Sequence, residues 1–418
     1  MGKQKQLSKS WDFGDTKEDL IHRIHHYPAR FPAFITTRAL EYSEQYGVKV
    51  ENVADVFCGC GTTAVEAKRN GKNFWGCDLN PVATLIAQTK THYYRDSKLD
   101  SILNQILEYF YNQPKNSENL KFNERISYWF NDTNMEDLNH LKNSIYINTF
   151  PYSAHRKFFL CAFSAILKPT SYWLGKSIKP QVDPNKKPRE VIASFEKQVS
   201  LMRRANQNNI FPKPLAKTKI LTKNFLGQSK DPPRTELIVT SPPYVTSYDY
   251  ADIHQLSTLW LGYATDYRQL RKNMLGNKYG VTSPDRGLIK KLGDSAWETY
   301  NAMNSIEKRH SYSIARYFID LDKTVSKCWN FLSDIGMAVF VIGNTQYKDV
   351  SINNAELLQE SMSRVGFHSI QRIKRQVSLK SIPTYRDKYG RFTNKDKHRK
   401  VYAEEFVIIG LKNKTSKQ

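Results

Sequence analysis

Short hydrophobic runs alternate with amphipathic stretches near the start of the chain. Residues 52–57 (NVADVF) and 73–77 (NFWGC) are apolar runs of strand length. Each is followed by a stretch with helical spacing of its apolar residues, TTAVEAKRNG from Thr62 and LNPVATLIAQT from Leu79. Strands that alternate with helices are typical of a parallel sheet. The pattern therefore predicts a βαβα unit.

The alternation stops at residue 95. Residues 95–215 are rich in Asn, Lys and Tyr, and prolines recur from Pro169 to Pro214. We expect this part to be an inserted region of helical or irregular structure. Strand patterns return at residues 219–224 and at 236–240 (ELIVT), after which a second polar insertion covers about 246–315.

The last hundred residues predict two helices and three strands. The helices are expected at 317–332 and 353–365, and the strands at 336–342, 367–377 and 402–411. The whole pattern predicts an α/β fold, a doubly wound Rossmann-like sheet with an antiparallel last strand pair and a helical or irregular insertion. The expected organisation is residues 1–94 as an N-terminal segment with one half of the catalytic domain, 95–215 as the insertion, and 216–418 as the other half.

The charge of the chain is unevenly distributed. The 418 residues carry 63 Lys and Arg against 40 Asp and Glu, a net charge of +23. Residues 151–230 hold 16 basic and 3 acidic residues, and residues 364–418 hold 15 and 4, so the remainder is close to neutral. An excess of this size favours a polyanionic partner, and nucleic acid is the one we expect.

Membrane and redox signals are weak. The longest apolar stretch, 158–167, has half the length of a membrane span, and the N-terminus lacks the apolar core of a secretory signal. The five cysteines form no paired CxxC motifs, which predicts neither a disulfide framework nor a zinc site. We expect no membrane association and a cytoplasmic location.

A glycine-rich turn lies between the first strand and the first helix. In the run DVFCGCGTT, Gly59 and Gly61 allow close approach of a ligand, and the following helix offers free N–H groups. Asp78 ends the next strand, 19 residues after Gly59, where a carboxylate can bind both hydroxyls of a ribose. The third glycine of the dinucleotide fingerprint and the GK[ST] of a P-loop are absent. S-adenosylmethionine, which has a ribose and no phosphate, fits this pattern.

A second motif, SPPY, follows the strand at 236–240. Two consecutive prolines fix the backbone and remove two N–H donors, so carbonyl groups at the strand end stay free to accept hydrogen bonds. Ser241 adds a hydroxyl acceptor and Tyr244 an aromatic face. This combination suits the exocyclic amino group of a planar base.

Together the motifs resemble those of the amino-group DNA methyltransferases, which form N4-methylcytosine or N6-methyladenine. The glycine turn, Asp78 in CDLNP and the SPPY tetrapeptide match the family's cofactor and catalytic motifs. The stretch HHYPARFP (25–32) is similar to an element that packs around the methionine end of the cofactor, and IGNT (342–345) is similar to the family's post-catalytic half. The resemblance covers roughly residues 21–92 and 218–411.

The resemblance implies two sets of site residues. Those expected at the cofactor are Tyr27, Pro28, Phe31, Asp55, Phe57, Gly59, Gly61, Thr62, Asp78 and Asn224, the last standing where relatives often carry an acid near the adenine. Those expected to be catalytic are Ser241, Pro242, Pro243 and Tyr244. The motif order places DNA recognition in 95–215 or in 246–315, and the basic block favours the former.

Direct transfer to an amino group is the chemistry that the motifs imply. Ser241 and the Pro242 carbonyl would hold the amino protons, and Tyr244 would stack on a base flipped out of the duplex. Carbon methylation of cytosine requires a Pro-Cys pair, and no cysteine here follows a proline. Cys58 and Cys60 are therefore interpreted as packing residues. His22, His25 and His26 do not have a zinc-binding spacing, so no metal is expected.

The resulting hypothesis is a site-specific DNA methyltransferase. Serine before Pro-Pro-Tyr favours the N4 amino group of cytosine over the N6 amino group of adenine. Double-stranded DNA is the expected substrate, with a cognate restriction endonuclease as a second partner. The Arg364–Lys400 stretch, with Phe367, Tyr385, Tyr389 and Phe392, is a further candidate for phosphate contacts. An RNA methyltransferase, or a non-catalytic nucleic-acid-binding protein on the same scaffold, is the alternative.

Overall fold

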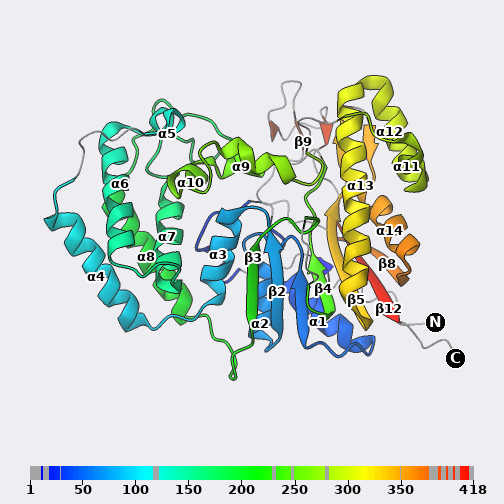
Figure 1. Ribbon diagram of the computed structural model, residues 1–418, viewed down its shortest axis with the longest axis horizontal. Coiled ribbons are helices and arrows are strands. Elements are labelled where there is room, and N and C mark those ends of the chain that lie inside the picture. The colour runs from blue at the N-terminus through cyan, green and yellow to red at the C-terminus, as the bar shows by residue number, and fades with distance from the viewer. Residues whose placement is uncertain are drawn as a thin grey trace.

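In the computed structural model of the chain, the described residues are 11–12, 18–28, 30–115, 122–227, 232–245, 249–277, 282–348, 350–375, 385–386, 392–393, 399–400 and 405–413. The structure has a central sheet with helices on both faces and a group of helices beside it (Figure 1). None of the helices within these ranges is long and apolar enough to cross a membrane.

Seven strands form the central sheet, in the order β3-β2-β1-β4-β5-β12-β8. Their bounds are β1 (Asn52–Asp55), β2 (Asn73–Asp78), β3 (Thr218–Thr222), β4 (Thr235–Thr240), β5 (Leu332–Gly343), β8 (His368–Arg375) and β12 (Glu405–Asn413). The first five strands in the order pair in parallel, whereas β12 runs antiparallel to both β5 and β8. The prediction of a doubly wound sheet with an antiparallel last pair is confirmed.

Side chains on alternate positions of the strands enter two separate cores. On β5, Met337 and Val339 point to one face and Ala338 and Phe340 to the other. The first face is covered by α1 (Phe34–Gln45) and α2 (Thr62–Arg69). The second is covered by α11 (Arg286–Lys291), α12 (Asp294–Ile306), α13 (Lys308–Phe331) and α14 (Asn354–Val365). Burial of both faces explains why the central strands are continuous apolar runs.

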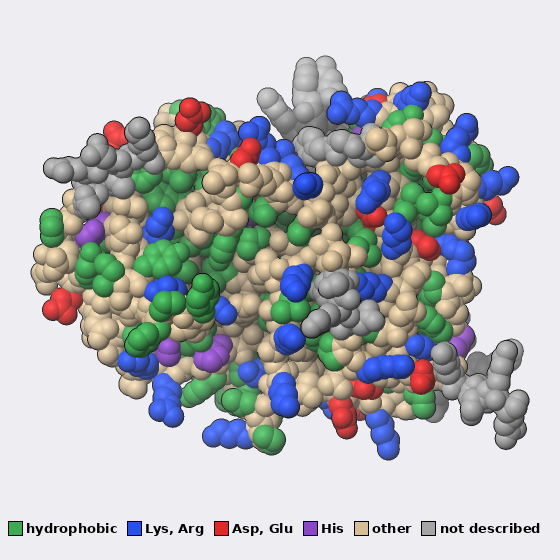
Figure 2. All heavy atoms as spheres, in the orientation of Figure 1, with side chains coloured by type: hydrophobic (Ala, Val, Ile, Leu, Met, Phe, Trp, Pro, Cys, Tyr) green, Lys and Arg blue, Asp and Glu red, His purple; other side chains and the backbone are tan. Residues whose placement is uncertain are grey.

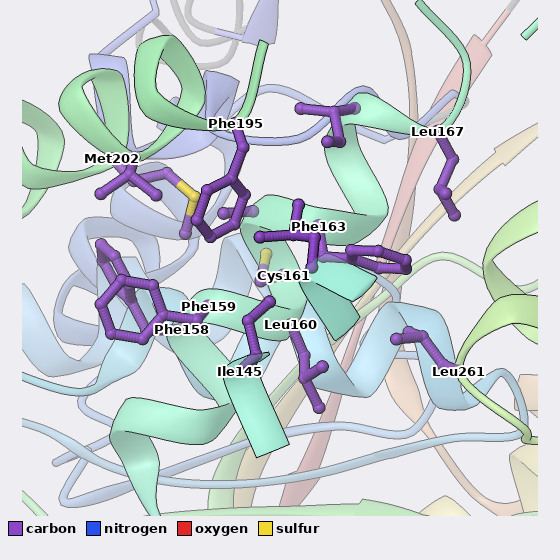
Figure 3. Packing of buried hydrophobic residues seen from close by; sticks show 14 of the residues in the cluster. Ile145, Phe158, Phe159, Leu160, Cys161, Phe163, Leu167, Phe195, Met202 and Leu261 are labelled. Carbon is purple, nitrogen blue, oxygen red and sulfur yellow. The ribbon is translucent and has the colours of Figure 1, made fainter. Parts of the chain in front are cut away.

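The region after α3 (Pro81–Thr91) is helical and has a core of its own. Its helices are α4 (Asp96–Asn112), α5 (Glu124–Trp129), α6 (Asp132–Ile147), α7 (Ala154–Ile166) and α8 (Val191–Gln207). Phe158, Phe159 and Phe163 of α7 are fully buried, with Phe195 and Met202 of α8 packed around them (Figure 3). The same core includes Val82, Leu85 and Ile86 of α3, so the helical region is packed directly against the sheet domain.

The described parts of the expected polar insertion, 249–277 and 282–315, contain several helices. They contain α9 (Tyr250–Ile253), α10 (Gln255–Trp260), the 3-10 helix η3 (Tyr267–Asn273), α11 and α12. Leu256 and Trp260 of α10 join the core of the helical region, whereas α11 and α12 join the second face of the sheet. The predicted start of the following helix at residue 317 was wrong, since α13 begins at Lys308. Its first turns bury the small polar side chains of Ser311 and Ser313, which a hydrophobicity pattern does not mark as buried.

The remaining elements are short. They are η2 (Leu20–Arg23), β6 (Thr345–Tyr347), β7 (Val350–Ile352), β9 (Tyr385–Arg386), β10 (Phe392–Thr393) and β11 (Arg399–Lys400). Of the candidate phosphate-binding stretch 364–400, Tyr389 and the side chains of Tyr385 and Phe392 lie outside the described part of the chain. Phe367 is buried in the second core, against α14 and Trp329, so its inclusion in a phosphate-binding surface was wrong.

Candidate active site

A cavity of about 1240 Å³ opens at the carboxyl ends of β1, β2 and β4. The chain passes from β1 outward to β2 and β3 on one side, and continues from β4 to β5 on the other. Ligands of open α/β sheets bind at this kind of switch point. The predicted site residues that line the cavity are Tyr27, Phe31, Asp55, Phe57, Gly59, Thr62, Asp78, Asn224, Ser241, Pro243 and Tyr244. Pro28, Gly61 and Pro242 are not among the lining residues.

The two glycines of the turn have different roles. Gly59 has a φ of +46° and lines the cavity, and a Cβ there would lie 3.5 Å from the ring of Tyr27. Gly61 has a φ of +78° and faces α3, where a Cβ would come within 2.6 Å of the Ala87 Cβ. Gly59 therefore allows access to the cavity, whereas Gly61 allows α2 to pack closely on α3.

Asp78 shapes the turn as well as facing the cavity. Its Oδ2 accepts a hydrogen bond from the Gly59 N–H at 2.9 Å, and its Oδ1 accepts one from the Asn80 N–H at 2.8 Å. Each carboxylate oxygen has a second lone pair, so capacity remains for a ligand hydroxyl. Burial raises the pKa of Asp78 from its usual value, and the backbone N–H groups of Asn80 and Gly59 oppose that rise.

Asp55 joins the glycine turn to the SPPY strand. Its Oδ1 accepts from the Thr240 hydroxyl at 2.6 Å and from the Phe57 N–H at 3.1 Å, and its Oδ2 accepts from the Thr63 hydroxyl at 2.8 Å. Burial raises the pKa of Asp55 to about 6, against the effect of these hydrogen bonds. Because Thr240 directly precedes Ser241, this carboxyl group sets the spacing between the two motifs.

Tyr244 is held from the far edge of the sheet. Its hydroxyl donates to Glu405 Oε1 at 2.9 Å, and Glu405 Oε2 forms an ion pair with Arg375 Nε at 3.0 Å. Burial raises the pKa of Tyr244 well above its usual range, and the Glu405 carboxylate raises it further. Sequence reasoning missed Glu405 and Arg375, which lie more than a hundred residues beyond the motif and have no local signature.

Two comparisons with known proteins bear on this site. A family model described as DNA methylase matches residues 1–89, the part that contains the glycine turn and Asp78. The Type II methyltransferase M.MvaI of Kocuria varians is 24% identical over 432 residues, which covers 96% of this chain and 93% of that protein. The chain is similar to the amino-group DNA methyltransferases in both comparisons. It is a methyltransferase, and its fold is the Rossmann-like sheet predicted from the sequence.

Solved structures also include similar chains. The rRNA methyltransferase aviRa from Streptomyces viridochromogenes is 9% identical, with a TM-score of 0.31 over 97% of this chain and 94% of that chain. A second structure of the same protein is 8% identical, with a TM-score of 0.28.

In this methyltransferase the stretch HHYPARFP closes one side of the cavity. Tyr27 stacks on His254, with ring centroids 5.0 Å apart, and on Tyr250, with centroids 6.3 Å apart. His25 Nε2 lies 2.9 Å from the Ser164 hydroxyl, and burial lowers the pKa of His25 to about 4. Of this stretch, Ala29 lies outside the described residues. The histidine therefore ties the segment to the helical region and leaves Tyr27 facing the cavity.

His22, Cys58 and Cys60 are also packed inside the protein, whereas His26 is exposed. His22 Nε2 lies 2.8 Å from Glu66 Oε1, and burial lowers its pKa. Cys58 and Cys60 are buried, and burial raises the pKa of the Cys58 thiol well above its usual value. A thiol with this pKa is a poor nucleophile at neutral pH.

Asn224 lies where β3 leads into the cavity. Its Oδ1 accepts from the Leu226 N–H at 3.0 Å, and its Nδ2 donates to the Asn273 carbonyl at 3.3 Å. The side chain therefore connects the loop after β3 to the end of η3 while it lines the cavity.

Basic side chains surround the mouth of the cavity. Lys179 comes from the helical region, Lys223 follows β3, Lys272 is on η3 and Lys323 is on α13; all four line the cavity and are exposed. Figure 2 shows Lys and Arg side chains spread over this face, above α9 and along α13. Only Lys179 and Lys223 belong to the basic block 151–230, so the positive mouth is assembled from separate parts of the chain.

Proposed function

We propose that this enzyme transfers a methyl group from S-adenosylmethionine to the exocyclic N4 amino group of cytosine at specific sites in double-stranded DNA. We further propose that it is the modification enzyme of a Type II restriction system, with a cognate endonuclease that acts on the same sites. The observation that carries the proposal is that one cavity contains both Asp78, at the end of β2, and the SPPY tetrapeptide, after β4. Similarity to a Type II methyltransferase over nearly the whole chain adds support.

The residues at the cofactor end fit S-adenosylmethionine. Asp78 keeps acceptor capacity for ribose hydroxyls, Gly59 presents bare backbone, and Tyr27, Phe31 and Phe57 supply apolar surface. Bound there, the sulfonium group would supply an activated methyl. Asn224 would contact the adenine with an amide in place of an acid. Pro28 and Gly61 would act from behind, since they do not line the cavity.

The SPPY end would hold the base. The Ser241 hydroxyl, which lines the cavity, would accept a hydrogen bond from the amino group and direct its lone pair away from the ring and toward the methyl group. Pro242 does not line the cavity in this structure, so its carbonyl would serve as the second acceptor only if the strand end turns toward the base. Tyr244 would stack on the flipped base and replace its neighbours in the duplex. Since no covalent nucleophile is required, the rate would come from positioning and electrostatics.

The choice of cytosine rests on Ser241, because serine in the first position of the motif favours the N4 amino group. Adenine N6 methylation is the alternative. Mass spectrometry of nucleosides from DNA of cells expressing the chain tests both, and we expect N4-methylcytosine. N6-methyladenine would replace the cytosine assignment, and methylated nucleosides found only in RNA would replace the DNA substrate. Cells expressing Tyr244→Ala, which removes the stacking ring, should contain neither modified DNA base.

The cofactor assignment predicts the behaviour of Asp78→Ala. Loss of the carboxylate removes the ribose acceptor and also the hydrogen bond that holds the Gly59 N–H. We expect the dissociation constant for S-adenosylmethionine to rise by about 10-fold or more in a calorimetric titration, since hydrogen bonds to charged groups contribute about 1.5–3 kcal/mol. Asp334→Ala, an exposed carboxylate at the opposite end of β5, is the control. An unchanged titration for Asp78→Ala would remove this residue from the cofactor site.

A further inference from the structure

The hydroxyl of Tyr244 donates a hydrogen bond to Glu405, which forms an ion pair with Arg375. Neither the glycine turn nor the SPPY motif predicts this ion pair. Glu405 is the first residue of β12 and Arg375 the last residue of β8, and the two are directly paired in the sheet. Because β12 runs antiparallel to β5, its first residue lies at the sheet end where β4 leads into SPPY. The antiparallel pair thus places a carboxylate beside the cavity.

The arginine of the ion pair is buried and the carboxylate is half-buried. The Arg375 side chain is 1% exposed and that of Glu405 is 17% exposed. Arg375 also lies over the ring of Phe34 at the start of α1, 5.7 Å from its centroid. With one carboxylate oxygen on Arg375 and the other on Tyr244, Glu405 has little freedom to rotate. A hydrogen bond to a charged acceptor in such a site is stronger than one between neutral groups.

We propose that Glu405, itself held by Arg375, is a positioning residue that fixes the ring of Tyr244 in the orientation required for stacking on the flipped base. The proposal rests on the function proposed above. Tyr244 follows two prolines with rigid backbone, so the remaining freedom of its ring is rotation of its own side chain. The anchor at the para-hydroxyl removes that freedom before the base arrives. Fixing the ring in advance should therefore increase the rate of methyl transfer and leave the affinity for the cofactor unchanged.

Removal of Glu405 alone would leave Arg375 as an unpaired buried charge, which can unfold a protein. The test therefore replaces the pair by apolar residues, Glu405→Leu with Arg375→Met, which removes the anchor without leaving a charge. Tyr244→Phe removes the same hydrogen bond from the other side, together with the contact between the Tyr244 hydroxyl and the Ser241 side chain, and retains the ring. Each change should lower kcat by about 10- to 100-fold, the scale expected when a reacting group is misplaced. The KM for S-adenosylmethionine and the dissociation constant for S-adenosylmethionine should both stay within about twofold of wild type, because the ring positions the base and not the cofactor.

A double-mutant cycle separates anchoring from a direct role of the hydroxyl. If the hydroxyl acts only through Glu405, the combined triple change lowers kcat no further than Tyr244→Phe alone. Losses that multiply would overturn the proposal. Glu405→Gln combined with Arg375→Met retains an acceptor oxygen for Tyr244 without leaving a buried charge, and it should recover most of the activity lost in the apolar pair variant. The matched control is Glu307→Gln, because Glu307 also accepts from a tyrosine, Tyr347, at 3.0 Å and pairs with a lysine, Lys348, at 3.0 Å.

A readout that needs no catalysis distinguishes failure of the anchor from failure of the proposed function. In protein labelled with 3-fluorotyrosine, the ¹⁹F resonance of Tyr244 can be assigned by its loss in Tyr244→Phe. It should shift or broaden in the apolar pair variant and not in Glu307→Gln. An unchanged Tyr244 resonance would overturn the anchor whether or not the enzyme methylates DNA. If the resonance shifts in the apolar pair variant while the wild-type chain methylates no DNA, the anchor is supported and the proposed function is overturned.

Discussion

At the scale of single residues, Asp55 is the buried group on which both loops of the cavity depend. Its three hydrogen bonds join the turn after β1, the first turn of α2 and the last residue of β4. Burial nevertheless outweighs these bonds and raises its pKa from 3.8 to about 6. The folded protein therefore binds a proton on Asp55 more tightly than the unfolded chain does.

This raised pKa predicts how stability depends on pH. The stabilising contribution of protonated Asp55 is complete below about pH 4 and is lost as the pH rises through about 6, where the carboxyl group ionises in the folded state. The shift from 3.8 to about 6 corresponds to about 3 kcal/mol, as an order of magnitude. The side chain of Asp55→Asn cannot ionise. The unfolding free energy of this variant should therefore rise relative to that of wild type as the pH increases from 4 to 7. If the unfolding free energies of the two proteins change with pH by the same amount over this range, the assignment is contradicted. Asp334→Asn changes an exposed carboxylate and should show no such rise relative to wild type.

Residues that carry local chemistry could be found from the sequence, and residues that act from a distance could not. Gly59, Asp78 and Tyr244 stand in motifs whose spacing follows from strand, turn and strand end, and all three line the cavity. Glu405 and Tyr250 reach the same site only through the sheet order and the path of α9. A single charged or aromatic residue gives no signal of such a contact, because partner and motif are far apart in the chain.

At the scale of elements, the close approach of α2 and α3 decides the geometry of the turn. α2 begins directly after Gly61, whose positive φ turns the chain into the helix. The space for a side chain at this position is already filled by Ala87 of α3. The glycine is therefore required for two independent reasons, its backbone conformation and the helix contact.

Gly61→Ala and Gly47→Ala together separate these two requirements. Gly47 has a similar φ of +73° and no atom within 4 Å of its missing Cβ. Gly47→Ala should cost about 1–2 kcal/mol of unfolding free energy, the cost of a left-handed conformation. Gly61→Ala should cost about 1–3 kcal/mol more, because the added methyl group overpacks the contact with Ala87. Chemical denaturation measures both, and equal losses would show that the contact between α2 and α3 can relax.

The strands of the sheet were predicted because most of them are apolar runs followed by a clear turn or helix pattern. The helices within 249–277 and 282–306 were not predicted, since their sequence is polar and several of their buried positions, such as Gln255 and Thr258, carry polar side chains. In α13 the buried faces of Ser311 and Ser313 carry hydroxyl groups, which a hydrophobicity pattern counts as exposed. The secondary structure of such segments is determined by tertiary packing and not by the residues next to them in the sequence.

At the scale of the whole molecule, the positive charge is better described by its position than by its block in the sequence. The block 151–230 contains Lys179 and Lys223 at the mouth of the cavity, but also Lys213 and Lys217, which precede β3. Since β3 runs parallel to its neighbours, the residues before it lie at the amino ends of the strands and the cavity at their carboxyl ends. The two pairs of lysines thus carry the same charge and belong to the same block of the sequence, but they lie at opposite ends of the sheet.

This arrangement predicts which lysines contact DNA phosphates. Lys179→Gln with Lys223→Gln should weaken binding to a labelled duplex of random sequence. It should also lower the slope of log K against log salt by about 2, since each phosphate contact contributes about 0.9. Lys213→Gln with Lys217→Gln removes the same charge from the other end and should leave the slope unchanged, which fluorescence anisotropy at several salt concentrations can measure. Equal losses for the two pairs would show that only net charge matters. A loss confined to the second pair would place the DNA at the opposite end of the sheet, away from SPPY.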